Sequence, residues 1–273
     1  MNIKTRNKIT YVSFMLAVFI VWHHTYNVEV YGLTGFLSIV EKYLLYIFDS
    51  AVSLFFVISA FLFYYNLEKR SIEKKLKARV FSLVLPYLIW NIIGYIYFQI
   101  LSFFPFIKDN YSGMIEPFSF LGVIKSAFIG DYNLVTWFLR CLIIYTYVFP
   151  IIYKALKNKY VFYVVFTIAL TVSYFYASYS EIVAYMNYYL LGIGLSLHHK
   201  EFFLSRYSNA IKIYSLIVYL VLIAIFTINN YSDTSIQRII IYLICSLLMW
   251  IFFDIFAIER KPKWWMQTSF VIY

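Results

Sequence analysis

The chain has 273 residues, of which 63% are hydrophobic and only 13% charged, and its formal net charge is +10. A soluble domain carries roughly 25% charged residues, so this composition excludes an ordinary soluble fold and indicates a surface that faces lipid. The positive charge lies in short segments between apolar stretches, which is typical of cytoplasmic loops of membrane proteins and argues against nucleic-acid binding. Both cysteines, Cys141 and Cys245, fall inside apolar stretches and are predicted to be unpaired packing residues.

Apolar stretches long enough to cross a bilayer, which takes about 20 residues, recur along the whole chain. The first one ends at Trp22–Tyr26 without a small-residue cleavage site, so it is interpreted as an uncleaved span and not as a signal peptide. The predicted spans are residues 9–26, 44–66, 80–104, 134–153, 160–177, 181–198, 211–229 and 237–257. The sequence therefore predicts an all-α, polytopic transmembrane helix bundle of about eight spans.

Charge alternates between the connecting segments. Acidic residues mark one set of loops, with Glu29, Asp109, Glu116 and Asp233. Basic residues mark the N-terminus, the other set of loops and the C-terminal segment: Lys4, Arg6, Lys8, Lys69, Arg70, Lys74, Lys75, Lys77, Arg79, Lys154, Lys157, Lys159, Lys200, Arg206, Lys212, Arg260, Lys261 and Lys263. The positive-inside rule places both termini in the cytoplasm. Residues 1–273 are predicted to form one membrane domain, in which the outer loop 105–133 dips onto the membrane surface or packs over the helices.

The first span carries a histidine, and polar groups inside a membrane are functional candidates because burying them is costly. Residues 13, 17, 20 and 24 share one helix face, on which Ser13 and Ala17 allow close helix contact. His24 is therefore expected to point into the bundle, and His23, on a bulkier face with Val12 and Leu16, toward lipid. The alternative is that both histidines are interfacial anchors beside Trp22.

Asp49 near the start of the second predicted span is expected to lie at about the depth of His24. A carboxylate beside an imidazole fixes its tautomer and raises its basicity, so the two residues are candidates for acid–base chemistry. The alternative is a carboxylate favoured by the helix N-terminus through capping and dipole effects.

Further charged side chains flank or enter the third and fourth spans. The cluster of Lys75, Lys77 and Arg79 is either a topology signal or a cradle for an anionic molecule entering from the cytosol. Arg140 lies inside the fourth span after Trp137, in the outer third of the membrane, where its side chain could also snorkel. Weaker buried candidates are Asn91, Gln99, Asn187 and Asp254, whereas His198 and His199 are expected at the inner interface.

Several of these landmarks together resemble the acyltransferase-3 family of integral membrane acyltransferases. The resemblance rests on their order and spacing along nearly the whole chain, from the segment IVWHHTYN that ends the first span to the final SFVIY. The local patterns are residues 20–27 (IVWHHTYN), 51–62 (AVSLFFVISAFL), 79–90 (RVFSLVLPYLIW), 137–140 (WFLR), 189–192 (YLLG) and 269–273 (SFVIY). The alignment makes His24 the counterpart of the family's histidine.

The sequence departs from the family pattern at four places. Ser13 stands where the family usually has Arg or Lys, Ser82 replaces the second Arg of an Arg-x-x-Arg stretch, and Ala60 replaces a glycine. The family also usually continues for two more spans beyond the point that corresponds to Tyr273, so a C-terminally truncated and inactive acyltransferase is one expectation.

The resemblance implies an O-acyltransferase that moves an acyl group, most commonly acetyl, from cytoplasmic acetyl-CoA or another acyl-CoA to a hydroxyl of an envelope or exported polysaccharide. His24 would act as general base or carry the acyl group, with Asp49 orienting it. Lys75, Lys77 and Arg79 would bind the phosphates of the donor, and Trp137 and Arg140 the glycan or lipid-linked glycan acceptor. No metal is implied, and the expected location is the bacterial cytoplasmic membrane, in contact with membrane lipid.

The competing interpretation is transport, for example of a lipid-linked sugar, because transporters also have many spans and scattered intramembrane charges. The pair formed by the histidine and the basic cluster distinguishes the two classes, since transport does not require it. The sequence contains no Walker loop, no His-Glu-x-x-His and no Cys-x-x-Cys motif, which argues against an ATP-driven pump and a zinc protease.

Overall fold

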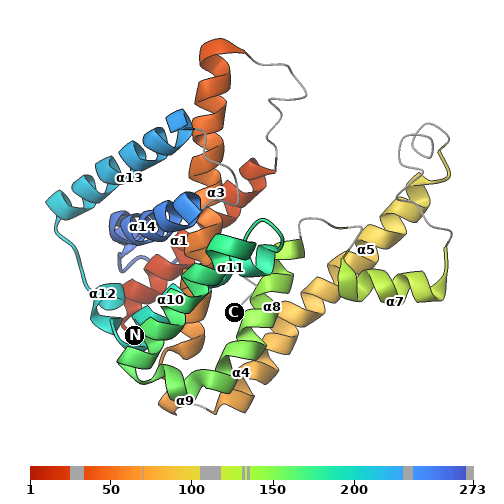
Figure 1. The fold of residues 1–273 in the computed structure, drawn as a ribbon, viewed down its shortest axis with the longest axis horizontal. Helices are drawn as coiled ribbons and strands as arrows, with labels where there is room; N and C mark the ends of the chain where they lie inside the picture. The colour runs from red at the N-terminus through yellow and green to blue at the C-terminus, as the bar shows by residue number, and fades with distance from the viewer. Residues whose placement is uncertain are drawn as a thin grey trace. The chain divides into compact units, whose positions relative to one another are not determined.

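The computed structural model describes residues 1–24, 34–69, 71–104, 118–130, 133, 136–229 and 236–268. In this part of the chain every regular element is a helix, which agrees with the predicted fold class. The chain divides into two compact units (Figure 1). The first unit comprises residues 1–69 and 151–271, and the second comprises residues 70–150 with the last two residues.

The first unit is built around α3, which runs from Gly35 to Tyr64. Its residues 49–61 are all buried, as expected for a helix that is apolar on every side. The helices packed on α3 are α1 (Ile3–His23), α11 (Glu181–Leu197), α13 (Asn209–Asn229) and α14 (Ile236–Phe252), and α10 (Lys159–Tyr176) packs on α11 (Figure 1). Short helices complete the unit: η1 (Leu67–Lys69), α9 (Tyr153–Leu156), α12 (Lys200–Leu204), η5 (Phe253–Phe256) and α15 (Trp264–Thr268).

A glycine brings α11 against the backbone of α3. A Cβ atom placed on Gly192 would lie 2.3 Å from the carbonyl oxygen of Val57 and 2.7 Å from the Cβ of Ala60. Small residues at a helix crossing let the two backbones approach closely, which favours packing where lipid supplies no hydrophobic driving force. Gly192 and Ala60 therefore fix how closely the two helices approach.

The second unit begins with a long helix of changing geometry. It consists of α4 (Ile72–Arg79), the π-helical turn η2 (Val80–Val84) and α5 (Leu85–Leu101). Pro86 lies at the start of α5, where its ring removes one backbone donor and crowds the preceding turn. The wider π-helical turn directly before Pro86 accommodates this interruption without breaking the run. The helix α8 (Trp137–Val148) packs on the π-helical turn, and η4 (Phe149–Ile152) follows it.

The short helix α7 (Phe120–Ile129) packs on α5 within the second unit (Figure 1). Ser119 caps its start by accepting a hydrogen bond from the amide of Gly122 (2.9 Å). Gly130 ends it with φ +79°, a left-handed conformation that glycine adopts without strain. The prediction that loop 105–133 packs over the helices is thus met by α7, while residues 105–117 lie outside the described residues.

Six helical runs in the described residues are long and apolar enough to cross a membrane: Gly35–Tyr64, Ile72–Leu101, Trp137–Leu156, Lys159–Tyr176, Asn209–Asn229 and Ile236–Phe256. The predicted spans 9–26 and 181–198 correspond to α1 and α11, which are helices but are not among the six. The helix α1 is not among them because its first turns are polar, and α11 is not among them because it has only 17 residues. The prediction of eight spans with cytoplasmic termini stays a prediction, as does that of one domain.

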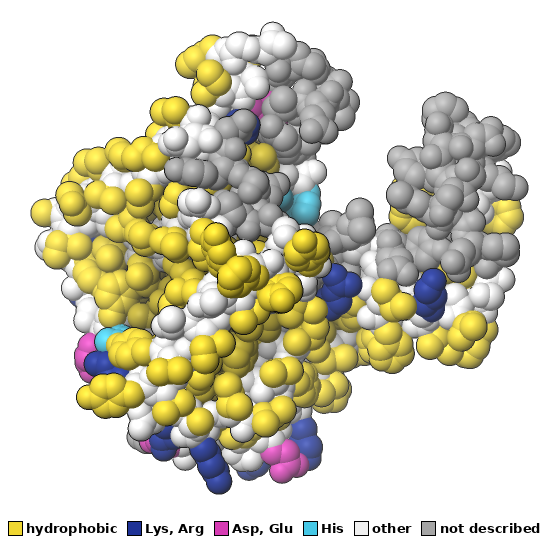
Figure 2. Space-filling view, viewed as in Figure 1, with side chains coloured by type: hydrophobic (Ala, Val, Ile, Leu, Met, Phe, Trp, Pro, Cys, Tyr) yellow, Lys and Arg dark blue, Asp and Glu magenta, His cyan; other side chains and the backbone are white. Residues whose placement is uncertain are grey.

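Large apolar side chains cover the outside of these helices. Figure 2 shows hydrophobic side chains over α13 and α10, among them Tyr160, Val164, Ile168, Ile213, Tyr214, Ile217 and Val221. Exposed apolar surface of this extent is not stable in water. The molecule is therefore a multi-pass membrane protein whose outer helix faces contact lipid.

Candidate active site

His24 lies at the C-terminal end of α1. Its backbone amide donates to the carbonyl of Ile20 (3.2 Å), which closes the last helical turn. The imidazole packs edge-on against the ring of His23, with centroids 5.3 Å apart. Trp22, near His24 in the chain, packs on Phe48, the neighbour of Asp49, with ring centroids 5.3 Å apart. The end of α1 that carries His24 therefore lies beside the turn of α3 that carries Asp49, and the pairing of the two side chains stays a prediction.

The prediction about the faces of α1 is wrong in part. Val12 and Leu16, expected toward lipid, are fully buried, as is Ser13 on the other face. The His24 side chain is exposed, whereas His23 is half-buried with its Nδ1 atom enclosed. Bulky side chains can pack against a neighbouring helix as well as small ones do, so residue size did not separate the buried face from the lipid face.

Asp49 does not lie at a helix N-terminus, which corrects the position expected for it. The helix α3 begins at Gly35, 14 residues or roughly 21 Å of helix before Asp49. N-terminal capping therefore cannot explain this carboxylate. Its partner is Arg238 on α14: the guanidinium donates from Nη2 to Oδ2 of Asp49, and both residues are buried.

Arg238 is a site residue that the sequence analysis missed. It lies in the first turn of α14, and its guanidinium also sits over the ring of Tyr242 at 5.2 Å, a distance suited to a cation–π contact. The signal that could have found it is an arginine inside the apolar stretch 237–257, since a charge within a span is a functional candidate by default.

Neutral hydrogen bonds also join α3 to α14 and α13 near this ion pair. The Ser53 and Ser246 hydroxyls lie 2.8 Å apart and join α3 to α14. The Ser50 and Tyr219 hydroxyls, also 2.8 Å apart, join α3 to α13. These contacts stabilise the packing of the three helices independently of the charged pair.

The three basic candidates lie together at the start of the second unit. Arg79 is buried at the end of α4, Lys75 is half-buried, and Lys77 is exposed. Lys77 forms an ion pair with Glu73 one turn earlier (2.8 Å), which offsets part of its charge.

Arg140 and Trp137 both lie on α8, and Arg140 has a structural partner. Its Nη1 donates to the carbonyl of Ile129 (3.2 Å) at the end of α7. The two preceding carbonyls of α7 also accept side-chain hydrogen bonds, from Tyr87 (to Phe128, 2.9 Å) and from Asn91 (to Ala127, 3.4 Å). The last carbonyls of a helix lack intrahelical donors, so these three side chains hold the end of α7.

A second buried cluster surrounds Asp254, a weaker candidate from the sequence. Its Oδ1 accepts from Lys8 (3.3 Å) and Arg206 (3.1 Å), and its Oδ2 accepts from the amide of Tyr207 (3.1 Å). Lys8 precedes the predicted first span, and its ammonium group also donates to the carbonyl of Trp250 (2.7 Å). Burial lowers the pKa of Lys8 to about 7, and the charge of Asp254 opposes that shift. The buried cation of α1 is therefore Lys8, near the end of the helix opposite His24, while Ser13 has no hydrogen-bond partner among the described residues.

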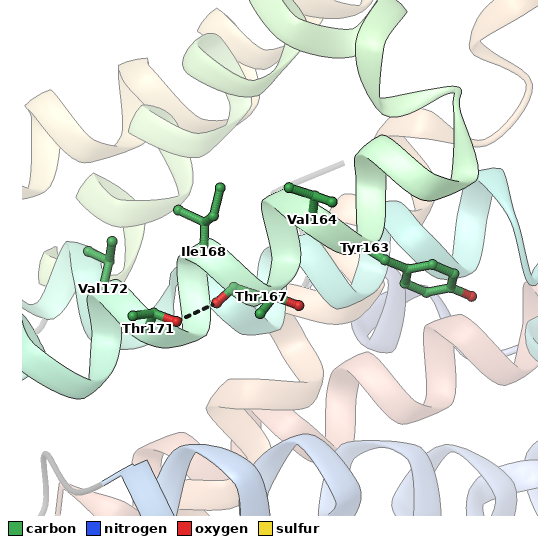
Figure 3. A pocket seen from close by; sticks show the side chains of 6 residues that line it. All are labelled: Tyr163, Val164, Thr167, Ile168, Thr171 and Val172. Atoms are coloured by element: carbon green, nitrogen blue, oxygen red, sulfur yellow. Dashed lines mark hydrogen bonds between the residues drawn. The ribbon is translucent and has the colours of Figure 1, made fainter.

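Two apolar grooves lie on the outside of the first unit. One, of about 400 Å³, is lined only by side chains of α10, from Tyr163 to Val172 (Figure 3). The Thr171 hydroxyl in this groove donates a hydrogen bond to the carbonyl of Thr167 (3.0 Å). The other groove, of about 320 Å³, lies between α10 and α11 with His199 at its edge. Neither is lined by His24, Asp49 or Arg238, and their apolar walls suit lipid chains better than a reacting centre.

Comparison with known proteins identifies a family but no close relative. No curated protein and no solved structure matches the chain. Residues 7–273 match the acyltransferase-3 family, described as an acyltransferase domain. The match spans the segment that carries His24, Asp49, the basic cluster, Trp137, Arg140 and Arg238. The chain therefore belongs to the acyltransferase-3 family of integral membrane acyltransferases.

Proposed function

We propose that this protein transfers an acyl group, most commonly acetyl, from cytoplasmic acyl-CoA to a hydroxyl of an envelope or exported polysaccharide in the bacterial cytoplasmic membrane. The observation that supports it most is the exposed His24 imidazole at the end of α1, where Trp22 packs on Phe48, the neighbour of Asp49, in a chain of an acyltransferase family. An accessible histidine beside a carboxylate is suited to general acid–base catalysis.

In the proposed reaction His24 removes the proton of the acceptor hydroxyl as its oxygen attacks the thioester carbonyl. The carbon–sulfur bond then breaks, the acyl ester forms, and the departing CoA sulfur takes the proton that His24 holds. A variant of this route passes the acyl group through His24 itself. In both, the Asp49 carboxylate stabilises the imidazolium that forms.

The donor carries phosphate groups, which basic side chains recognise. Lys75, Lys77 and Arg79 lie together at the start of the second unit and are proposed to bind these phosphates, with Lys77 also paired to Glu73. For the acceptor, Trp137 offers an aromatic ring and Arg140 a guanidinium with five N–H donors. One of those donors is engaged with the carbonyl of Ile129, so Arg140 in this proposal also holds α7 beside the acceptor.

The test is replacement of His24 by alanine in a host whose own copy of the gene is deleted. We expect O-acetyl groups on the surface polysaccharide, measured by NMR, to fall by about 10²-fold or more, as expected for loss of a general base. His23→Ala is the matched control, because His23 neighbours His24 at the same helix end, and it should retain acetylation. Normal acetylation with His24→Ala would contradict the role of His24.

Transport of a lipid-linked sugar and an inactive acyltransferase are the competing functions. An assay with membrane vesicles that contain the protein and are supplied with radiolabelled acetyl-CoA distinguishes acyl transfer, transport and an inactive protein. Incorporation of label into glycan supports acyl transfer. Glycan translocation that is independent of acyl-CoA would support transport. The absence of both activities with every acyl-CoA tried would support an inactive protein.

A further inference from the structure

The ion pair of Arg238 and Asp49 is an unusual feature for the interior of a membrane bundle. Both residues are buried, and they come from helices that are far apart in the sequence, α14 and α3. Moving two charges out of water costs several kcal/mol per ion, and a buried pair often stabilises a fold no more than apolar side chains of similar volume would. Stability alone therefore does not explain why these positions carry charges.

The packing of α3 on α14 has polar contacts besides this pair. Ser53 and Ser246 form a hydrogen bond between these helices, and Ser50 bonds to Tyr219 on α13. The charged pair is therefore not the only polar contact that joins α3 to α14.

Arg238 fixes the orientation of the Asp49 side chain. A guanidinium donates in a fixed planar geometry, so it holds a carboxylate in one orientation. The turn of α3 that carries this carboxylate lies beside the end of α1 that carries His24, because Phe48 packs on Trp22 with ring centroids 5.3 Å apart.

We infer that Arg238 is a positioning residue for acyl transfer, which holds the Asp49 carboxylate in place near His24 so that Asp49 stabilises the imidazolium formed during the reaction. The inference rests on the proposed function. Arg238 itself exchanges no proton in this step: the acceptor's proton moves to His24 and then to the CoA sulfur, while the ion pair persists. The assignment adds a third residue, from α14, to the pair on α1 and α3.

The test compares kcat and KM of purified protein in proteoliposomes for Arg238→Lys, Arg238→Gln and the neutral double variant Asp49→Asn with Arg238→Gln. We expect kcat to fall by about 10²-fold for Arg238→Gln and for the double variant, since the positioned Asp49 carboxylate is lost in both. The KM for acyl-CoA should change by less than about threefold, because an interaction made only in the transition state is removed. Arg238→Lys, which keeps the cation, should restore most of the activity.

Folding is monitored separately by thermal denaturation in detergent. Arg238→Gln alone leaves a buried carboxylate without its partner and should lower Tm, whereas the double variant should regain much of that loss. The matched control is Ser53→Ala with Ser246→Ala, which removes a neutral contact between the same helices and should leave kcat per folded molecule unchanged.

The outcomes separate this inference from the proposed function. Wild-type kcat per folded molecule in Arg238→Gln would overturn the role of Arg238 while leaving acyl transfer intact. A low kcat per folded molecule in Arg238→Gln that Arg238→Lys restores, with the KM for acyl-CoA unchanged, supports it, because a merely structural pair would change Tm and not kcat. Absence of acyl transfer by the wild-type protein would overturn the proposed function, and the role of Arg238 with it.

Discussion

Asp254 shows how one buried side chain joins segments from the two ends of the sequence. Its two carboxylate oxygens accept from Lys8, Arg206 and the amide of Tyr207. Hydrogen bonds to charged groups contribute more than neutral ones, and breaking a buried pair by removing one partner is strongly destabilising. Asp254 therefore ties the start of α1 to the segments that flank α12 and α14.

Replacing Asp254 with alanine is expected to destabilise the protein by about 3–5 kcal/mol, because Lys8 and Arg206 lose their common acceptor. The measurement is thermal or chemical unfolding in detergent. The control is Glu259→Gln, which removes the partner of Lys4 in an ion pair whose side chains are 46% and 74% exposed and should have little effect. Equal Tm values for the two variants would contradict a structural role for the Asp254 cluster.

Among the helices, the contact of α11 with α3 depends on a glycine that lies against a backbone carbonyl. The Gly192 hydrogen faces the carbonyl of Val57, whereas Gly194 on the same helix faces the ring of Phe162, 2.4 Å from where a Cβ would lie. A carbonyl oxygen of a buried helix has nowhere to move, but a phenylalanine ring on the outer helix α10 can turn aside. Equal substitutions at the two glycines should therefore differ in effect.

Gly192→Ala is expected to destabilise the protein by about 1–3 kcal/mol, the usual cost of overpacking. Gly194→Ala is the matched control, with a smaller loss because the Phe162 ring can shift. Both are measured as changes in Tm under the same detergent conditions. A larger loss for Gly194→Ala than for Gly192→Ala would show that the spacing of α3 and α11 is not set by Gly192.

At the scale of the whole molecule, the distribution of side chains defines what surrounds the protein. Exposed apolar residues cover the lipid-facing helices, and the ionised groups inside are paired, as Asp49 with Arg238 and Asp254 with Lys8. Both native cysteines are fully buried. Newly introduced cysteines can therefore report which side of the membrane each loop faces.

Lys74→Cys is expected to react with a membrane-impermeant maleimide only after the membrane has been opened, since the positive-inside rule places this exposed residue in the cytoplasm. Tyr179→Cys, at a position that is 83% exposed between α10 and α11, should react in intact spheroplasts. Labelling of Lys74→Cys in intact spheroplasts would show that the predicted orientation is inverted.

The helical elements followed closely from the sequence. Predicted spans such as 160–177, 211–229 and 237–257 differ by three residues or fewer at either end from the runs Lys159–Tyr176, Asn209–Asn229 and Ile236–Phe256. Local information is enough here, because a long apolar stretch in lipid has to satisfy its own backbone hydrogen bonds as a helix. The start of α3 was misplaced, at 44 instead of Gly35, because polar residues such as Ser38, Glu41 and Lys42 interrupt its first turns.

The site was only partly predictable, because local sequence shows which residues are polar but not which helices become neighbours. The sequence by itself determined the helical membrane fold and singled out His24 and Asp49, since a charged or titratable group in an apolar stretch is visible in one dimension. Only the tertiary structure decided that Asp49 pairs with Arg238, 189 positions away, that Arg140 holds the end of α7, and that Val12 and Leu16 face the core. Each of these depends on which helices are neighbours and how they are rotated, and in lipid that choice comes from packing and polar pairing between helices.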